Sequence, residues 1–283
     1  MLRAVVVGLD GSPESQAAVE WAAREARLRD LPLTLVSVLE PVPEPVVQAP
    51  LMGAETRQHW IDRTPREYAE GLRLRHPGVT VGVRRLSGRP GQLLPQRARE
   101  DEALLVLGSR GLSGVAGFLV GSVGLVAVAH ADQPVVLVRA GEQAADEHLP
   151  DPAGIPSAAT PYRPVVLGLD ACDPHDAVIG FAFDAAARRS TSLRVVHADP
   201  PRRTPAELAG TLRPWARAFP QVAMVDEARS GAAAGHLAAA SQDASLVVVG
   251  RRIRRAPVGP RIGPVAHSVL HRAASPVAVV PHH

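Results

Sequence analysis

Residues 103–111 read Ala-Leu-Leu-Val-Leu-Gly-Ser-Arg-Gly, and after nine more residues the chain continues with Gly121 and Ser122. The apolar run before Gly108 is typical of a strand that is buried on both faces of a parallel sheet. From Ser122 to His130 the chain is again mostly apolar, which predicts a buried helix that begins at the serine. A strand, a glycine-containing loop and a helix start are therefore expected in succession.

This segment has the features of an anion-binding loop. The first four amides of a helix have no partner within it, and the helix dipole adds partial positive charge at the same end. Phosphate is a natural ligand there, and glycine lets the backbone approach it closely. The chain has no lysine, so it lacks the Walker A pattern, and the G-x-G-x-x-G spacing is not met either. The spacing alone leaves open whether the loop binds an anion or is only a turn.

Composition excludes several classes of protein. The chain has 283 residues, a formal net charge of only +3 and one cysteine, Cys172. A charge balance this small does not indicate nucleic-acid binding, and a single cysteine excludes a disulfide framework. The N-terminal apolar run is too short for a signal peptide, and no run approaches the length of a membrane span. We expect a cytoplasmic protein that binds neither a membrane nor nucleic acid.

The chain contains an internal repeat. The run 5–10, Val-Val-Val-Gly-Leu-Asp, is matched 160 positions later by Val-Val-Leu-Gly-Leu-Asp at 165–170. Both runs lead into an expected helix start, with proline in the first helical position at Pro13 and Pro174. Further matching strands are expected in the same order in both halves, at 33–38 and 193–198, 104–108 and 245–250, and 133–138 and 275–280.

Strands that alternate with helices predict the fold class. Helices are expected at 14–29 and 90–100, and a strand with one wetter face at 78–85. We predict an α/β protein with two tandem doubly wound domains, each a five-stranded parallel sheet with helices on both faces. The domains are expected at 1–140 and 163–283, joined by an aperiodic linker at 141–162. The proline-rich stretch 41–50 is expected to be a loop beside the first site.

At this point the chain resembles the tandem, ATP-binding form of the universal stress protein family over nearly its whole length. The family pattern G-2x-G-9x-G-(S/T) is met by Gly108, Gly111, Gly121 and Ser122. The resemblance implies a Rossmann-like fold of the adenine nucleotide alpha hydrolase type. It also implies binding of ATP, or another adenine nucleotide, with Mg²⁺ or Mn²⁺ bridging phosphate oxygens and no metal ligand from a protein side chain.

The resemblance assigns roles to individual positions. Asp10 would lie at the adenosine end of the ligand, and the backbone of Val38 would contact adenine. Leu107 and Arg110 would lie beside the ribose and the phosphates, while residues 121–123 would hold the β- and γ-phosphates. The implied nucleotide-binding set is Asp10, Val38, Leu107, Gly108, Arg110, Gly111, Gly121, Ser122 and Val123.

Each assignment has a structural alternative. Asp10 can serve as a turn or helix-capping residue, Ser122 as a helix N-cap, and Arg110 as a solvated loop arginine. Repulsion between a carboxylate and a triphosphate favours placing Asp10 at the sugar or base. Ligands of open parallel sheets bind outside the carboxyl ends of the strands, where Asp10, Val38 and Gly108 are all expected.

The second half departs from the pattern. Ile253 replaces the second glycine and Pro264 the hydroxyl residue, which removes an amide and a hydroxyl from the helix start. We expect one intact site and one degenerate site, whose candidate residues are Asp170, Ala198, Gly250 and Gly263. Its loop carries a basic cluster that can replace the lost amides, bind an acidic partner or simply be solvated, at Arg251, Arg252, Arg254, Arg255 and Arg261.

The leading function is an ATP-binding regulator of the stress response with slow or no hydrolysis and no assigned catalytic residue. One alternative is a weak ATPase or nucleotidyl transferase. Another is a scaffold that docks an acidic partner through the second-domain arginine loop. Aromatic residues make up only 3% of the chain, which disfavours single-strand nucleic-acid binding. We also expect the two domains to pair within the chain, through apolar last strands, and the chain to form a homodimer.

Overall fold

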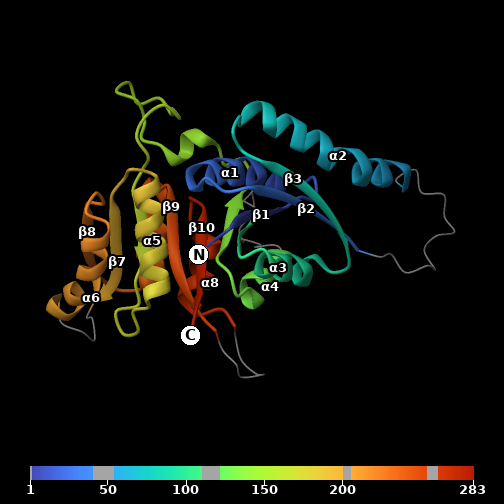
Figure 1. Ribbon diagram of the computed structural model, residues 1–283. Coiled ribbons are helices and arrows are strands. Elements are labelled where there is room, and N and C mark those ends of the chain that lie inside the picture. The colour runs from blue at the N-terminus through green and yellow to red at the C-terminus, as the bar shows by residue number, and fades with distance from the viewer. Residues whose placement is uncertain (1, 41–53, 110–121, 200–204, 254–260) are drawn as a thin grey trace. The chain divides into compact units, whose positions relative to one another are not determined.

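The computed structural model describes residues 2–40, 54–109, 122–199, 205–253 and 261–283 (Figure 1). The chain divides into two compact units. The first contains most described residues up to Gly141, and the second contains residues 142–283 together with 134–137. The expected loop at 41–50 and most of the glycine loop lie outside the described residues.

The first unit alternates strands and helices as predicted. In the strand order β3-β2-β1-β4-β5, parallel pairing joins β3 to β2, β2 to β1 and β1 to β4. Helices α1 and α2 pack on one face and α3 and α4 on the other (Figure 1). The elements are β1 Ala4–Gly8, α1 Pro13–Arg29, β2 Leu33–Leu39, α2 Ala54–Arg75, β3 Val81–Ser87, α3 Pro90–Glu100, β4 Ala103–Ser109, α4 Ser122–His130 and β5 Val135–Arg139, whose residues 135–137 cluster with the second unit.

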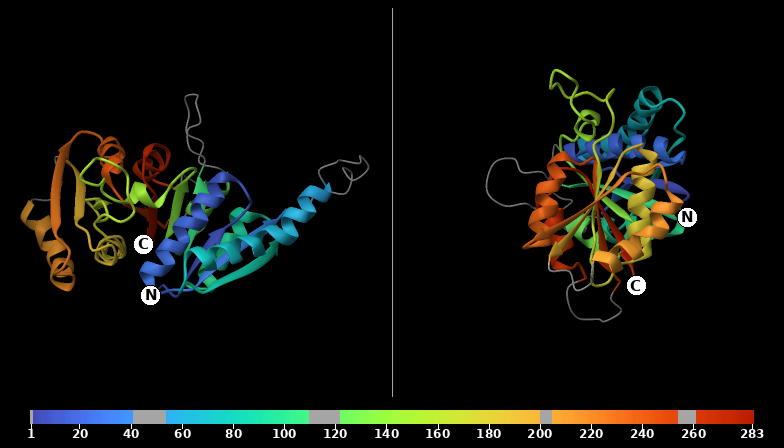
Figure 2. Two further views of the ribbon diagram at one scale, coloured as in Figure 1. Left: turned by 90° about the horizontal axis from the view of Figure 1, so that it is seen from above. Right: turned by 90° about the vertical axis from the view of Figure 1, so that its left-hand side faces the viewer.

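The second unit repeats this arrangement. Its strands follow the order β8-β7-β6-β9-β10, and all four neighbouring pairs are parallel. Helices α5 and α6 cover one face and α7 and α8 the other, as the end-on view in Figure 2 shows. The elements are β6 Val165–Gly168, α5 Asp176–Arg188, β7 Leu193–Asp199, α6 Pro205–Ala218, β8 Met224–Ser230, α7 Ala233–Ala240, β9 Leu246–Arg252, α8 Pro264–Arg272 and β10 Val277–His282.

The central strands form the core of each unit. Val5, Val6 and Val7 in β1 are fully buried, as are Val165 and Val166 in β6. Because side chains alternate between the two faces of a strand, continuous burial means that helices cover both faces. The α/β class and the doubly wound, Rossmann-like arrangement are therefore confirmed. In the described part of the chain, none of the helices combines the length and apolar character that a membrane span needs.

One predicted helix start is wrong. The sequence pattern places Pro174 in the first position of α5, but the helix begins at Asp176, and His175 is its N-cap. The Nδ1 atom of His175 accepts a hydrogen bond from the amide of Ala177 at 3.2 Å. In the first unit the expected cap is confirmed, because the hydroxyl of Ser12 accepts a hydrogen bond from the amide of Ser15 at 3.2 Å. Relative to the repeat, α5 therefore begins about one turn later than α1.

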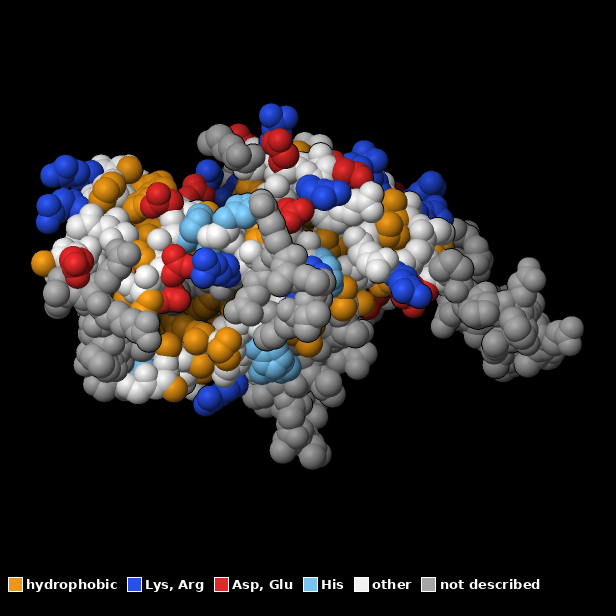
Figure 3. All heavy atoms as spheres, turned by 90° about the horizontal axis from the view of Figure 1, so that it is seen from below, with side chains coloured by type: hydrophobic (Ala, Val, Ile, Leu, Met, Phe, Trp, Pro, Cys, Tyr) orange, Lys and Arg blue, Asp and Glu red, His pale blue; other side chains and the backbone are white. Residues whose placement is uncertain are grey.

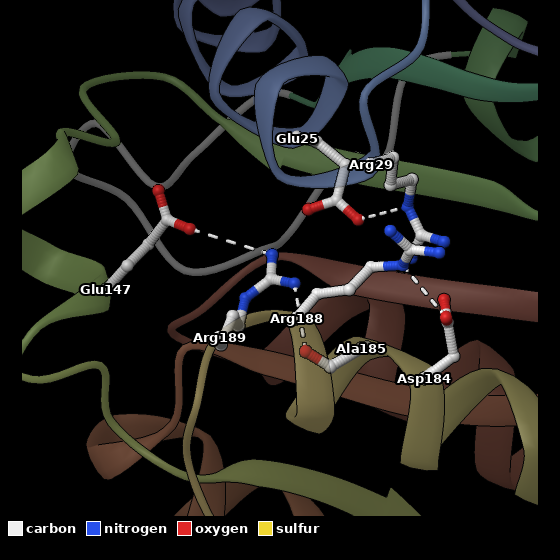
Figure 4. Close-up of polar contacts among 7 residues, drawn as sticks. All are labelled: Glu25, Arg29, Glu147, Asp184, Ala185, Arg188 and Arg189. Atoms are coloured by element: carbon white, nitrogen blue, oxygen red, sulfur yellow. Dashed lines mark hydrogen bonds and ion pairs between the residues drawn. The ribbon is translucent and has the colours of Figure 1, made fainter.

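The segment expected as an aperiodic linker clusters with the second unit from Glu142 onward. It contains a short 3-10 helix, η2 at Ala144–Glu147, and a bridge between His148 and Tyr162. Glu147 points towards the buried Arg189 at the end of α5, with 3.9 Å between the nearest oxygen and nitrogen atoms (Figure 4). The Arg189 guanidinium also donates to the carbonyl of Ala185 at 3.4 Å. These contacts tie the segment to α5.

Buried charges are also paired within the first unit. Glu25 and Arg29, one turn apart on α1, are 1% and 4% exposed and lie 2.6 Å apart (Figure 4). Removing one partner of such a pair leaves an uncompensated buried charge, which is strongly destabilising. The pair is therefore part of the packing of α1 and is remote in sequence from the residues assigned to a ligand.

Candidate functional site

The strand register of the first unit aligns three of the predicted site residues. Gly8 pairs with Val36, so the same register carried two residues further puts Asp10 level with Val38. Val7 pairs with Val106, which places Gly108 one residue beyond the end of β1. All three positions lie at the carboxyl edge of a parallel sheet, where open α/β folds bind their ligands.

Asp10 forms a tight turn at this edge. One carboxylate oxygen, Oδ1, accepts hydrogen bonds from the amide and hydroxyl of Ser12 at 3.0 and 2.6 Å. Burial raises the pKa of Asp10, but the hydrogen bonds from Ser12 and Ser15 outweigh it, so the pKa lies below its ordinary value. The carboxylate is ionised at neutral pH. The structural alternative is thus present, and because both hydrogen bonds from Ser12 end on Oδ1, the other oxygen, Oδ2, is the atom placed to accept from a ligand hydroxyl or amine.

Gly108 is required by packing as well as by any ligand. A Cβ atom at this position would lie 2.5 Å from the carbonyl carbon of Glu14 and 2.7 Å from the amide nitrogen of Ser15. Both are backbone atoms in the first turn of α1. A side chain at position 108 would therefore require α1 to move away from β4.

The remaining first-unit residues divide into three groups. Leu107 is 4% exposed, so its side chain belongs to the core. Val38, at the end of β2, and Val123, in the first turn of α4, are half-buried, and α4 begins at Ser122 as predicted. The last group lies outside the described residues and consists of Arg110, Gly111 and Gly121.

The second unit contains a cavity of about 630 Å³ at the carboxyl ends of its strands. This volume is within the range of small-molecule sites. Its apolar lining includes Leu169, Val178, Val196, Leu237 and Val249. Its titratable lining consists of Asp170, Cys172, Asp173, His175, Arg252, Arg261 and His282. Figure 3 views the molecule from the side on which β10 ends, and there hydrophobic side chains surround a hollow with acidic, basic and histidine side chains nearby.

This cavity brings together three of the four residues proposed for the second site, Asp170, Gly250 and Gly263. Gly168 pairs with Val196 on one side and Val249 on the other, so Asp170 is level with the fourth residue, Ala198. The register matches that of the first unit position by position. One carboxylate oxygen of Asp170 accepts a hydrogen bond from the Cys172 amide at 2.9 Å, which reproduces the turn around Asp10.

The glycine-loop positions of the second unit differ as predicted. Pro264 is the first residue of α8, so that turn lacks one amide donor, and the N-cap Gly263 provides no side-chain hydrogen bond. The amide of Ile253, which occupies the position of the second glycine, donates to the His282 carbonyl at 2.6 Å. That amide is therefore engaged by the protein. Two of the donors expected in an intact loop are unavailable here.

Histidine side chains fill part of the cavity wall. The rings of His175 and His282 have centroids 4.7 Å apart. A Cβ atom at Gly250 would lie 3.0 Å from Nε2 of His282 and 3.2 Å from Cγ2 of Val178. Since α5 begins late, side chains rather than helix backbone stand over this glycine. Burial is the largest influence and lowers the pKa of His282. The hydrogen bond to the His283 carbonyl opposes it, His175 lowers the pKa further, and smaller effects come from Asp173, which raises it, and Arg252, which lowers it.

The arginine cluster is not uniformly solvated. Arg251 lies in β9 and is only 5% exposed, so the solvated-loop interpretation is wrong for this residue. Arg252 is exposed at the cavity and lies 3.6 Å from Asp173, whereas Arg261 lines the cavity and has no ion pair within the described chain. Arg254 and Arg255 lie outside the described residues.

Sequence reasoning missed Asp173, His175 and His282 as cavity residues. The misplaced helix start hides His175. The sequence does contain a signal for His282. The last strand is expected to end at residue 280, and its carboxyl end must lie at the same edge of the parallel sheet as the carboxyl end of β9. His282 pairs in register with Arg252. The strand that follows a glycine motif in a parallel sheet thus contributes to the same site.

An adenine nucleotide with a divalent cation fits the described residues at its nucleoside end. Asp10 has an ionised carboxylate at the strand ends, and α4 begins at Ser122, where helix amides lack internal partners. Among the described residues there is no group of three or more side chains suited to hold a metal ion.

The comparisons with known proteins identify the family. The model of the "Universal stress protein family" matches residues 1–139 and again 161–281. The chain belongs to the universal stress protein family. A universal stress protein of Mycolicibacterium smegmatis is 31% identical over 98% of this chain and 96% of its own length. One of Mycobacterium tuberculosis is 31% identical over 97% and 95%.

Solved structures support the same fold. The crystal structure of a universal stress protein from Archaeoglobus fulgidus aligns over 99% of this chain and 98% of its own, with a TM-score of 0.73 and 15% sequence identity. Because identity is low, this likeness concerns the fold alone. The tandem repeat in the sequence is thus a pair of universal stress protein domains.

Proposed function

We propose that this universal stress protein binds an adenine nucleotide, foremost ATP with Mg²⁺ or Mn²⁺, in its first unit and acts as a nucleotide-dependent regulator of the stress response. The observation that carries the proposal is the convergence of Asp10, Val38 and Gly108 at one carboxyl edge, with an ionised carboxylate on Asp10. The matching edge of the second unit has a cavity of nucleotide-compatible size, which supports the same use of the repeat.

In this proposal different residues bind the base, the ribose and the phosphates. The Oδ2 atom of Asp10 accepts from a ribose hydroxyl or the adenine amine, and the half-buried end of β2 at Val38 faces the base. Gly108 opens the loop that leads through residues 110–121 to the start of α4. Helix-start amides from Ser122 and Val123 favour the phosphates, because they lack internal partners and lie at the positive end of the helix dipole.

Slow or absent hydrolysis fits the chemistry of Asp10. A general base works best with a pKa near the working pH, whereas hydrogen bonding holds the pKa of Asp10 below its ordinary value. An ionised Asp10 is a good hydrogen-bond acceptor but a poor proton acceptor. We therefore propose a binding role for Asp10 and assign no catalytic residue. A cytoplasmic location, a homodimer and pairing of domains within the chain remain part of the proposal.

The test measures ligand-induced stabilisation of the whole chain. ATP with Mg²⁺ at a hundred times its dissociation constant should stabilise the folded state by about 2.7 kcal/mol, which raises the melting temperature. Asp10→Ala should reduce the increase, whereas Asp170→Ala, the matching change in the repeat, should not. If purified protein carries no adenine nucleotide and ATP leaves the melting temperature unchanged, the proposed function is wrong.

A further inference from the structure

The described backbone of the second-unit cavity offers a polyphosphate fewer donors than an intact glycine loop would. Pro264 has no amide hydrogen, and the amide of Ile253 is already bonded to the His282 carbonyl. The ring of His282 and the side chain of Val178 cover Gly250. Among the described residues, one backbone donor of the glycine-loop pattern is thus missing and another is engaged, which leaves the amides of Val265 and Ala266 at the start of α8.

Side chains supply the positive charge instead. Arg252 and Arg261 line the cavity at the ends of the β9–α8 connection. Arg252 and its partner Asp173 are 66% and 51% exposed, so their 3.6 Å ion pair is weak and can be exchanged for another anion. Arg261 forms no ion pair within the described chain. Two guanidinium groups can therefore bind one phosphate, and planar guanidinium matches its oxygens in a bidentate manner.

The charges of the described cavity lining favour a small anion. Two aspartates, Asp170 and Asp173, line it together with the two arginines. A single phosphate monoester carries about −1.5 to −2 charges at pH 7, which two arginines can balance. A triphosphate tail carries more negative charge, and the two carboxylates would repel the excess. The apolar wall from Leu169, Val196 and Leu237, next to Asp170, suits a ring with polar edges.

We propose that the cavity of the second unit is a separate ligand site that binds a nucleoside monophosphate and discriminates against triphosphates. Arg252 and Arg261 hold the phosphate, and Asp170 faces the nucleoside. The nucleoside part of this inference rests on the proposed function, since it takes Asp170 to do what Asp10 does in the first unit. The phosphate part rests on the side chains of this cavity alone. The two units would then respond to different adenine nucleotides.

The test uses the full chain with Asp10→Ala, which weakens the first site, and measures binding by isothermal titration calorimetry. The probes are AMP, adenosine, inorganic phosphate and ATP with Mg²⁺. AMP should bind at least about ten times more tightly than each of the other three, since charge-assisted hydrogen bonds to a phosphate are stronger than those between neutral groups. Adding Arg252→Ala and Arg261→Ala should abolish the advantage of AMP over adenosine. Arg213→Ala with Arg217→Ala, two exposed arginines of α6 outside the cavity, is the charge-matched control and should change nothing.

Several results would overturn the inference. ATP binding as tightly as AMP would show that the site does not discriminate, and unchanged AMP binding without the two arginines would show that they do not hold the phosphate. If inorganic phosphate binds as tightly as AMP, the nucleoside does not contribute to binding and that part of the inference is wrong. Failure of the proposed function is distinguishable, because it appears as absent ATP binding in the unmodified chain, while arginine-dependent AMP binding still supports the second site.

Discussion

The two units share one strand register but differ in what stands over the same glycine. At Gly108 the backbone of Glu14 and Ser15 lies within 2.7 Å of the place that a Cβ atom would occupy, whereas at Gly250 the neighbours are the side chains of His282 and Val178 at 3.0 Å and beyond. The cause is the helix that follows the first strand of each unit, because α1 begins at Pro13 whereas α5 begins only at Asp176. A shift of one helical turn therefore replaces fixed backbone by adjustable side chains at an otherwise repeated site.

The largest expected effect is a difference in protein stability between alanine substitutions at these two glycines. Gly108→Ala should destabilise the first unit by about 3 kcal/mol, because α1 must move away from β4. Gly250→Ala should cost about 1 kcal/mol, since His282 can change its side-chain conformation. Urea unfolding followed by circular dichroism measures both. Gly263→Ala, with open space around the added methyl group, is the control. Equal losses at 108 and 250 would contradict the packing difference.

The next effect concerns the paired aspartates. Asp10→Ala should weaken ATP binding roughly 10- to 100-fold, because a hydrogen bond to a charged group contributes about 1.5–3 kcal/mol. Asp10→Asn keeps an acceptor and should lose less. The matching Asp170→Ala should leave ATP affinity unchanged and weaken AMP binding instead. Calorimetric titration of each variant provides the comparison, and an ATP loss from Asp170→Ala that equals the loss from Asp10→Ala would show that both units hold ATP alike.

A smaller effect is expected from restoring the helix start of the second unit. Pro264→Ser returns an amide and a hydroxyl to the first turn of α8, which should raise ATP affinity of that cavity about 3- to 10-fold. Pro264→Ala restores only the amide and should give part of the gain. Both are measured with Asp10→Ala in place. No gain from either variant would mean that the missing donors do not determine the ligand preference.

The smallest effect is a pH dependence of AMP binding. Burial lowers the pKa of His282, so the ring is neutral at pH 7 and gains charge only on acidification. His175, Asp173 and Arg252 are the other charged or titratable groups that act on it. Protonation adds a positive charge beside the phosphate, so affinity should rise a few-fold as the pH falls below the ordinary histidine pKa of about 6.5.

His282→Gln should remove this rise, and the comparison cancels the titration of the phosphate itself, which is common to both proteins. In the absence of ligand, acidification should instead lower the stability of the fold. A histidine whose folded pKa lies below its unfolded value stabilises the fold above the unfolded pKa, and that contribution is lost as the pH falls through the folded pKa. An identical pH profile for the two proteins would exclude His282 from the phosphate end.

Sequence patterns predict the repeated framework because strand burial and helix periodicity are local properties. The runs at 103–107 and 165–168 form β4 and β6, and the helices at Pro90–Glu100 and Ser122–His130 have the expected bounds. The same order of strands in both halves then brings Asp170 and Gly250 to one edge. The family membership, which the comparisons confirm, follows from the same spacing.

Other features depend on contacts that spacing does not encode. The late start of α5 arises because the His175 side chain caps the helix, in competition with the expected Asp173–Pro174 start. The packing role of Gly108 depends on how closely α1 approaches β4, and the cavity role of His282 on the pairing of β10 with β9. These are tertiary relations, so a local pattern can indicate the site but not its neighbours.

The central claim is that an intact donor set exists only in the first unit, and the number of ATP molecules bound per chain tests it most directly. Calorimetric titration of the unmodified full chain with ATP and Mg²⁺ should give one tight site per chain, and Asp10→Ala should remove it. Two sites of equal affinity, or none, would contradict the account.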